Sequence, residues 1–519
     1  MNELSVIPAN SVSFKEFLWG NRRNKMILNL VAIAIVIQFI IFKYLYPFAS
    51  FIFGDSFSYI ETAEQNLDIN TYMVGYSRFL RFFSVFTSSD TALVAFQYLL
   101  IQVSTLFLLF TVFYFYKPSR LVQTVLLAFM VLNPLYLHLG NLVSSDCLFA
   151  ALSITWFAVL LWLIHRPSNE LIVWQAVLIF ATFTVRYNAL IYPFIAAVAF
   201  YLSSLSLRKK LIGIVAGLVL CGLFVFYTSY KYKQLTGYWQ YSPFSGWQLT
   251  NNAMYAYRYV DAKDRKPVPR KFQAFDNMVR EYFDSTRDVS KHPQEAMEAS
   301  TVYMWTPDLS MFKYRDSLFR NDSSAIELKK WASMGPFYKS YGLFIIRQYP
   351  WKFIRHFLWP NANKYYAPQV EFLQLYNSGR SKVITNAMNW FKYKTTEVRI
   401  RMKSNNVWVL NFYPILFGIS NVIMFLTLIC YVLLKGWKTK PYSAKGILMG
   451  SAVWIINATF TIGASSPALR FQCFPILLTT VFVALLLEWL WKVAMSREDS
   501  TAQTELEMVS VINQSALMS

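Results

Sequence analysis

Long apolar runs separated by short polar connections dominate the pattern of hydrophobic and polar positions along the chain. A run of about 20 mostly apolar residues is long enough to cross the hydrocarbon core of a bilayer as a helix. The first such run, from Met26 to about Tyr46, follows Arg22, Arg23 and Lys25. Because no small-residue cleavage site clearly follows it, we interpret it as a retained signal anchor with a cytoplasmic N-terminus.

Nine more apolar runs predict further membrane spans, which makes about ten in all. They lie at 91–116, 121–140, 146–164, 171–188, 189–207, 211–232, 406–434, 446–463 and 473–492. The pattern therefore predicts an all-α polytopic membrane protein. Its expected segments are a cytoplasmic N-terminus (1–25), a transmembrane module (26–232) with a first outer loop (48–90), a large, mainly α outer loop (233–405), C-terminal transmembrane helices (406–492) and a polar cytoplasmic tail (493–519).

The charge of the short connections predicts the orientation of the spans. With a cytoplasmic N-terminus, four connections face the cytoplasm and each is basic, as the positive-inside rule requires. They carry Lys117 and Arg120, His165 and Arg166, Arg208 to Lys210, and Lys435 to Lys445. We therefore expect a multi-pass protein of the inner (plasma) membrane with both termini in the cytoplasm. The tail after Trp491 is polar and is expected to be disordered.

Composition supports a membrane protein and changes the interpretation of the charge. The chain is 55% hydrophobic and 15% charged, whereas soluble domains have roughly 45–50% and 25%. Its net charge of +21 is compatible with nucleic-acid binding. Much of this charge, however, lies at the ends of apolar runs, where it sets topology and meets anionic headgroups. We expect membrane lipids, and no nucleic acid, as partners.

The cysteines and histidines predict neither a disulfide framework nor a zinc site. The cysteines fall in or beside apolar runs and are interpreted as small core residues. They are Cys147, Cys221, Cys430 and Cys473. The histidines are scattered without the spacing of metal ligands. They are His138, His165, His292 and His356.

Aromatic residues interleaved with polar ones in the large loop allow two interpretations. They are able to stack on sugar rings, or they form the core of a small folded cap, which is the interpretation we favour. They include Trp239, Trp247, Tyr255, Tyr257, Trp305 and Trp359. Within the same loop, the stretch 341–359 combines aromatic and aliphatic residues with basic ones and contains Pro350, which predicts interfacial helices rather than another span.

Ionisable residues at the outer end of the bundle are the candidates for chemistry, because a charge near hydrocarbon is costly and is usually retained for a partner or a function. Asp55 is a candidate general base. The alternative is that it caps a helix beginning at Ser56. The arginines are candidates to hold a lipid phosphate, and their alternative is snorkelling to headgroups. These arginines are Arg78, Arg186 and Arg470.

Five groups of short segments follow one another in a distinctive order. They are Gly54-Asp55-Ser56-Phe57-Ser58-Tyr59 with Ala63; Gly75-Tyr76-Ser77-Arg78 with Gln97-Tyr98-Leu99-Leu100; Asn133-Pro134 with Ser145-Asp146-Cys147-Leu148-Phe149; Thr184-Val185-Arg186 with Pro193; and Arg470-Phe471 with Pro475. Together they resemble the motifs of polytopic GT-C glycosyltransferases, the superfamily that includes protein O-mannosyltransferases and the aminoarabinose transferases of lipid A. The resemblance covers residues 26–232 and recurs at 463–480.

The resemblance implies two interfacial helices in the first outer loop that frame an active site at the outer membrane face. It also implies a sugar donor carried on polyprenyl phosphate, with Asp55 as the catalytic base. The implied substrate and phosphate contacts are Arg78, Arg186, Arg470, Asp146 and Tyr59. For Asp146 the alternative is a cap on the fourth span, together with Ser144 and Ser145. No cofactor is firmly implied, although a divalent cation assists some relatives.

The sequence thus predicts a transferase that moves a sugar from its lipid carrier to an envelope lipid, glycan or protein by inverting displacement. Two alternatives use similar substrates. The first is a transporter or flippase of lipid-linked glycans, and the second is a polysaccharide polymerase or ligase. Transporters usually show internal repeats and mid-membrane polar sites. The chain has no convincing repeat, and its candidate polar residues gather at one face, so a transferase is favoured over a transporter.

Overall fold

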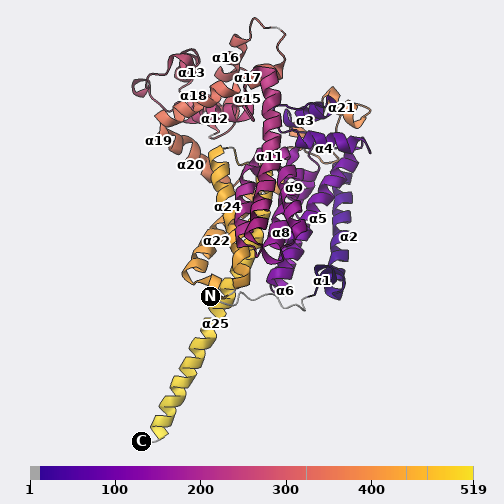
Figure 1. Ribbon diagram of the computed structural model, residues 1–519, viewed down its shortest axis with the longest axis vertical. Coiled ribbons are helices and arrows are strands. Elements are labelled where there is room, and N and C mark those ends of the chain that lie inside the picture. Colours follow the sequence, from indigo (N-terminus) through magenta and orange to yellow (C-terminus); the bar gives the residue numbers. More distant parts are fainter. Residues whose placement is uncertain (1–11, 298, 323, 440, 465, 518–519) are drawn as a thin grey trace.

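The computed structural model describes residues 12–297, 299–322, 324–439, 441–464 and 466–517 (Figure 1). Side chains are described as far as Met495, that of Pro441 excepted. Throughout these ranges the regular elements are helices, which confirms the predicted all-α class.

The helices fall into three consecutive groups. The first group is α1 (Phe14–Trp19), α2 (Arg22–Leu45), α3 (Asp55–Glu64), α4 (Gly75–Ser84), α5 (Asp90–Tyr116), α6 (Arg120–Val131), α7 (Pro134–Gly140), α8 (Ser145–His165), α9 (Asn169–Val185), η1 (Tyr187–Ile191), α10 (Tyr192–Leu202) and α11 (Leu207–Thr236). The second is α12 (Pro243–Tyr257), η2 (Ala262–Asp264), η3 (Arg270–Phe272), α13 (Gln273–Ser285), η4 (Val289–Lys291), α14 (Pro293–Ala296), α15 (Val302–Trp305), α16 (Ser310–Leu318), α17 (Glu327–Ser333), α18 (Gly335–Gln348), α19 (Pro350–Phe353), η5 (Ile354–Leu358) and α20 (Trp359–Tyr366). The third is η6 (Tyr376–Gly379), α21 (Thr385–Phe391), η7 (Trp408–Leu410), α22 (Tyr413–Leu433), α23 (Gly436–Thr439), α24 (Pro441–Ala464), η8 (Leu469–Gln472) and α25 (Cys473–Leu517).

Eight helices of the described residues are long and apolar enough to cross a membrane. They are Arg22–Leu45, Asp90–Tyr116, Arg120–Gly140, Ser145–His165, Leu207–Thr236, Trp408–Leu433, Tyr442–Ala464 and Leu469–Met495. The other two predicted spans, at 171–188 and 189–207, are the shorter apolar helices Asn169–Val185 and Tyr187–Leu202. They are short because Arg186 adopts an extended backbone (φ −151°, ψ 145°) and ends the first of them. The chain is therefore a multi-pass membrane protein by the length and composition of its helices.

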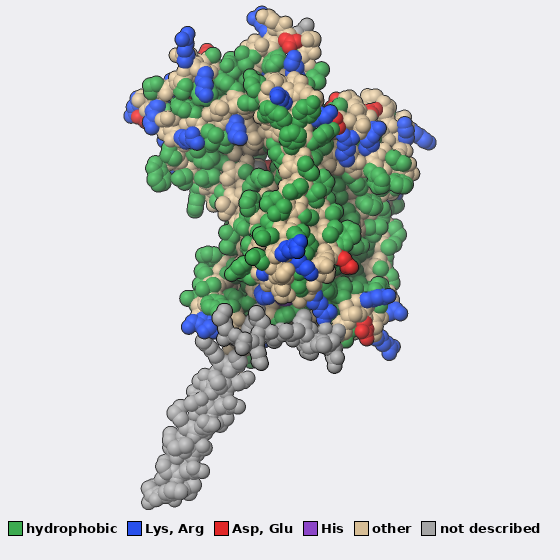
Figure 2. Space-filling model, in the orientation of Figure 1, with side chains coloured by type: hydrophobic (Ala, Val, Ile, Leu, Met, Phe, Trp, Pro, Cys, Tyr) green, Lys and Arg blue, Asp and Glu red, His purple; other side chains and the backbone are tan. Residues whose placement is uncertain are grey.

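The sides of the bundle are apolar and face outward. On α2, for example, Ile33, Ile37 and Ile40 expose 51–61% of their surface, which suits lipid and is costly in water. Figure 2 shows hydrophobic side chains along the sides of the bundle and Lys and Arg toward both of its ends. This distribution matches a bilayer-spanning body with charged ends.

The two ends of the bundle differ in what covers them. One end carries α3, α4 and the second group of helices, and we call it the capped face (Figure 1). At the opposite face the short basic connections meet: the Tyr116 hydroxyl lies 3.0 Å from His165 Nε2, and Lys445 Nζ donates to the Leu202 carbonyl at 2.9 Å. The segments that the sequence assigned to one side of the membrane thus lie at one end of the bundle.

Two helices of the first loop, α3 and α4, lie on the capped face, as the sequence predicted for 48–90. Gly75 begins α4 directly against the C-terminal end of α9, where a Cβ on Gly75 would stand 2.5 Å from the Thr184 carbonyl oxygen. A side chain at this position would force the two helices apart. The glycine therefore lets the first loop approach the segment that carries Arg186.

The elements from α12 to η5 form a separate hydrophobic core. Together with α20 we call them the loop domain (residues 243–366). Trp247, Tyr255 and Tyr257 are buried in this core, as expected for a folded cap. Helix α18 packs its Tyr338 and Tyr341 into the same core, against α12. Helix α18, which includes the first part of the stretch 341–359, therefore packs aromatic residues within the domain. The interfacial position of this stretch stays a prediction.

The C-terminal end of the chain also differs from the prediction. Helix α25 continues to Leu517, where the sequence predicted a disordered tail. The segment 493–517 contains neither glycine nor proline, the two residues that most disfavour a helix interior. Residues 518–519, like the predicted cytoplasmic N-terminus as far as residue 11, lie outside the described residues. The four cysteines are free thiols, and Cys430 is the one that is not fully buried.

Candidate functional site

Asp55 is the first residue of α3 and lies at the capped face. The residue before it, Gly54, has a φ of +94°, a backbone conformation that favours glycine. The Asp55 carboxylate accepts a hydrogen bond from the Tyr72 hydroxyl at 2.7 Å and pairs with Arg470 Nη2 at 2.7 Å. The alternative of a simple helix cap therefore does not describe this carboxylate. About 20% of its side chain remains exposed, so a substrate group has access to it.

Arg470 lies in η8, immediately before the last span, and joins the two acidic residues of the site. Its Nη1 pairs with Asp146 Oδ2 at 3.2 Å, while its Nη2 pairs with Asp55. The guanidinium carbon also lies 4.5 Å from the ring centre of Phe372 and 4.4 Å from that of Phe471. Only 6% of the side chain is exposed. Two carboxylates and two rings therefore fix this cation in one position.

Asp146 lies in the first turn of α8 and is shared by two arginines. Besides Arg470 it contacts Arg186, the residue at which α9 ends. The cap of α8 is Ser144, whose hydroxyl accepts the Asp146 backbone N–H at 3.2 Å and also bonds the Asp146 carboxylate. Of the three residues in the predicted capping alternative, Ser144 is the cap, and the Asp146 carboxylate pairs with the two arginines.

Two tyrosines flank the acidic residues. Tyr59, one turn along α3 from Asp55, is hydrogen-bonded to the Ser145 hydroxyl at 2.9 Å and lies 5.4 Å from Tyr72 between ring centres. Burial raises the pKa of Tyr59 and raises that of Tyr72 well above its ordinary value, to which the neighbouring Asp55 charge adds. Both phenols therefore stay protonated, and Tyr72 remains a hydrogen-bond donor to Asp55.

Tyr72 was missed by the sequence analysis, although it lies three residues before the Gly75 segment. A tyrosine in a polar loop carries little signal by itself, because only the folded loop brings its hydroxyl to Asp55. The one feature of the sequence that pointed to Tyr72 was its position between the Asp55 and Gly75 segments, both of which belong to the candidate motifs.

Arg78 does not join the other candidate residues. It lies on α4, two residues from the fully buried Tyr76, and a two-residue step on a helix turns a side chain to the opposite side. Its guanidinium pairs with Asp68 at 2.9 Å and is about 42% exposed. Lys231 pairs with the same carboxylate at 3.0 Å. Arg78 therefore lies outside the contacts that join Arg186 and Arg470 to Asp146.

The loop domain reaches the site through aromatic rings. Trp305 lies 6.1 Å from Tyr72 and 6.0 Å from Phe244 between ring centres, and Tyr72 lies 6.2 Å from Phe244. Trp305 is 38% exposed, whereas Trp239 and Trp359 are 52% and 66% exposed. Among the three exposed tryptophans of the sequence hypothesis, Trp305 is the one that contacts a residue bonded to Asp55.

The cluster of Asp55, Asp146, Arg186 and Arg470 has paired charges and is built from four distant parts of the chain. The separation between Asp55 and Arg470 is 415 residues, and that between Asp146 and Arg470 is 324. Such an arrangement combines a hydrogen-bond-accepting carboxylate with guanidiniums suited to an anion. Among the residues with described positions, no group of three or more His, Cys, Asp or Glu side chains is placed to hold a metal ion.

Searches of protein-family models, of curated proteins and of solved structures find no match to this chain.

Proposed function

We propose that the chain is a membrane glycosyltransferase of the GT-C type, which moves a sugar from a polyprenyl-phosphate carrier to an acceptor of the cell envelope. The observation that supports this most is the contact of Asp55 with Arg470 at 2.7 Å, beside Asp146 and Arg186, at one end of a membrane bundle. A base and a phosphate-binding cation are the two groups that this transfer needs side by side.

In this proposal Asp55 is the general base. The acceptor hydroxyl attacks the anomeric carbon from the side opposite the carrier, and its proton passes to the Asp55 carboxylate. The bond between the anomeric carbon and the phosphate oxygen breaks, and the phosphate leaves with the bonding electron pair. One displacement inverts the anomeric configuration. Tyr72 holds the carboxylate in place through its hydroxyl.

Arg470 and Arg186 stabilise the negative charge of the departing phosphate. In the free protein Arg470 is engaged by two carboxylates. A donor phosphate takes over part of the guanidinium, and this frees the Asp55 oxygen to receive the proton. Asp146 retains Arg186 and keeps both arginines facing the site.

The proposed orientation puts the capped face outside the plasma membrane and both termini in the cytoplasm. It is supported by the basic connections at the opposite face, which the positive-inside rule assigns to the cytoplasm. The acceptor, a lipid, glycan or protein of the envelope, then approaches under the loop domain, where Trp305 and Tyr72 offer aromatic faces to a sugar ring.

The test is transfer by purified full-length protein in nanodiscs, supplied with polyprenyl-phosphate sugar and envelope acceptor fractions. Asp55→Asn is expected to lower transfer by about 10²–10⁴-fold, the usual contribution of a general base. The matched control is Asp68→Asn, which removes an exposed carboxylate of the same loop and is expected to leave transfer unchanged. Full activity of Asp55→Asn contradicts its role as base.

The same assay separates the proposal from its alternatives. A flippase moves intact lipid-linked glycan across the bilayer and forms no new glycosidic bond, so such an outcome overturns the transferase proposal. A polymerase or ligase forms the bond with a long polysaccharide as product, which the size of the product reveals. The polar cluster lies at the end of the bundle rather than at mid-depth, and this favours bond formation at the membrane surface over transport.

A further inference from the structure

A basic segment outside the candidate site lies along the capped face. We call residues 376–403 the basic strap, which includes η6 and α21. Its exposed cations are Arg380, Lys382, Lys392, Lys394, Arg399, Arg401 and Lys403, against one acidic residue, Glu397. Arg399 pairs with Glu397 at 2.9 Å. The ion pairs found among the described residues include none of the other six cations. The strap therefore carries a large unbalanced positive charge.

Hydrogen bonds fix the start of the strap to the first loop. The Tyr376 hydroxyl donates to the Ala49 carbonyl at 3.0 Å, and the Asn377 N–H donates to the Ser50 hydroxyl at 2.9 Å. Asn377, Ser378 and Gly379 have φ values of 49°, 53° and 77°, all in the left-handed region. These three residues turn the chain sharply, so that the residues after them come back toward the first loop.

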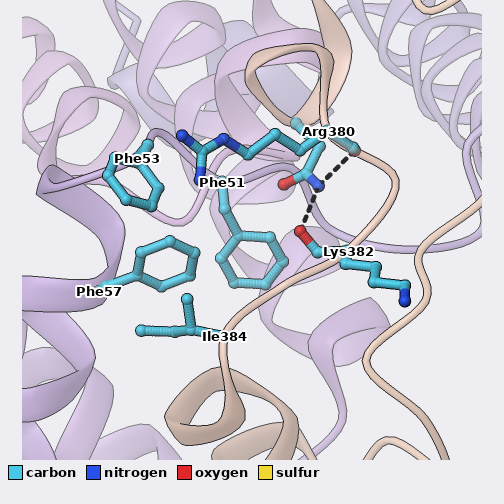
Figure 3. A pocket seen from close by; sticks show the side chains of 7 residues that line it. Phe51, Phe53, Phe57, Arg380, Lys382 and Ile384 are labelled. Atoms are coloured by element: carbon cyan, nitrogen blue, oxygen red, sulfur yellow. Dashed lines mark hydrogen bonds between the residues drawn. The ribbon is translucent and has the colours of Figure 1, made fainter.

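This turn creates a small open hollow between the strap and the start of α3 (Figure 3). One wall is apolar and consists of Phe51, Phe53, Phe57 and Ile384. The other presents the Arg380 guanidinium, whereas the Lys382 side chain at the rim extends away from the rings (Figure 3). The Arg380 guanidinium carbon lies 3.7 Å from the ring centre of Phe53, which is itself 54% exposed. The Asn377 amide donates to the carbonyls of Arg380 and Lys382 and holds both residues at the rim.

The hollow is separate from the candidate catalytic cluster. Phe53 lies before α3 and Phe57 in its first turn, and both line the hollow. Asp55 lies between them in sequence, and its carboxylate bonds instead to Tyr72 and Arg470. One short segment thus contributes its carboxylate to one site and its rings to another.

The strap lies at the level where a membrane span ends. The Arg401 N–H donates to the Leu45 carbonyl, the last of α2, at 2.9 Å, and the Arg401 guanidinium carbon lies 4.5 Å from the ring centre of Tyr44. Because α2 is apolar along its length and ends here, this level corresponds to the lipid headgroups. Exposed cations beside exposed aromatic rings match a headgroup phosphate above the first part of an acyl chain.

We infer that the hollow binds the phosphate headgroup of an anionic membrane lipid, with Arg380 on the phosphate and Phe53 against the apolar part of the lipid. The occupant is a lipid of the surrounding leaflet rather than a soluble anion, because the Arg380 guanidinium lies against an apolar wall at headgroup level. This inference does not depend on the proposed transferase activity.

The test measures lipid binding to the purified full-length protein by native mass spectrometry, with phosphatidylglycerol and phosphatidylcholine as probes. The wild-type protein is expected to retain phosphatidylglycerol in preference. The variant Arg380→Gln is expected to weaken this binding about fivefold, since a cation near an anionic surface contributes about 1 kcal/mol. The control is Lys339→Gln, which removes an exposed cation of the loop domain and is expected to change nothing.

Two further arms make the inference falsifiable. Phe53→Ala is expected to weaken phosphatidylglycerol binding but to leave the weaker binding of soluble glycerophosphoglycerol unchanged. Equal retention of both lipids, or an equal loss in Arg380→Gln and Lys339→Gln, overturns the inference. Displacement of phosphatidylglycerol by inorganic phosphate at similar concentration also overturns it, because the site would then be one for soluble anions.

Discussion

Two regions of the molecule bury an arginine against a carboxylate, and they differ in how they do so. In the loop domain, Arg258 pairs with Glu295 at 2.6 Å, and their side chains are 3% and 5% exposed. At the capped face, Arg470 pairs with Asp55 at 2.7 Å, with exposures of 6% and 20%. The first pair is closed to solvent on both sides, whereas the second leaves its carboxylate accessible.

The groups around the two pairs also differ, since one pair has local partners and the other has distant ones. Glu295 also accepts the hydroxyl of Tyr282, and Arg258 is bonded to the carbonyl and hydroxyl of Thr286, all within a local stretch of chain. Asp55 and Arg470 are 415 residues apart in the sequence. Arg470 also pairs with a second carboxylate, that of Asp146. A compact, closed hydrogen-bond network such as that of Arg258 stabilises a domain. A network in which two carboxylates share one arginine and one carboxylate stays accessible is able to bind a ligand.

The largest expected effect tests the structural side of this comparison. Glu295→Gln leaves the Arg258 charge buried without its partner, and the loop domain is expected to lose about 3–5 kcal/mol of unfolding free energy. Thermal unfolding of the purified protein, followed by the fluorescence of the loop-domain tryptophans, measures it. The control is Asp284→Asn, whose carboxylate is 45% exposed in its pair with Arg265 and is expected to cost at most about 1 kcal/mol. Equal losses in both variants contradict the comparison.

The next effect tests the functional side. Arg470→Gln is expected to lower the transfer rate about 10²–10³-fold, the usual effect of removing a group that stabilises developing negative charge. Arg470→Lys restores the charge but not the forked contact with both carboxylates, and is expected to recover only part of the rate. Initial rates at saturating donor measure both variants. A rate for Arg470→Gln within about twofold of wild type, with normal folding, would remove Arg470 from the mechanism.

The sequence predicted the membrane body well because hydropathy reports directly on the solvent that each run faces. Eight of the ten predicted spans are helices of spanning length. The segments that carry Asp55, Asp146, Arg186 and Arg470 were also found, although only the fold brings these side chains into contact. Arg78 lies outside these contacts, because the sequence located its segment but not the direction of its side chain on α4. Tyr72 was missed because its contact with Asp55 depends on a loop.

Tyr72 provides the third prediction, because it is what distinguishes Asp55 from a carboxylate paired with arginine alone. Tyr72→Phe removes a 2.7 Å hydrogen bond to Asp55 and keeps the ring against Trp305. Transfer is expected to fall about tenfold, since a hydrogen bond to a charged group contributes about 1.5 kcal/mol or more. The fall is expected in kcat with KM unchanged, because the hydroxyl positions the base. The matched control, Tyr76→Phe, removes a buried hydroxyl bonded to Gln97 instead; an equal fall there would indicate a packing effect.

The smallest expected effect asks whether the loop domain contributes to the site as well as folding over it. Trp305→Ala removes the exposed ring beside Tyr72 and is expected to raise KM for the acceptor about threefold to tenfold, since an aromatic contact contributes about 0.5–1.5 kcal/mol. Trp305→Phe is expected to keep most of the affinity. The control is Trp359→Ala, which removes a ring that is 66% exposed and is expected to leave KM unchanged. An unchanged acceptor KM in Trp305→Ala would mean that the loop domain, with its closed Arg258–Glu295 pair, is structural throughout. Acceptor recognition would then rest on the bundle and its first loop alone.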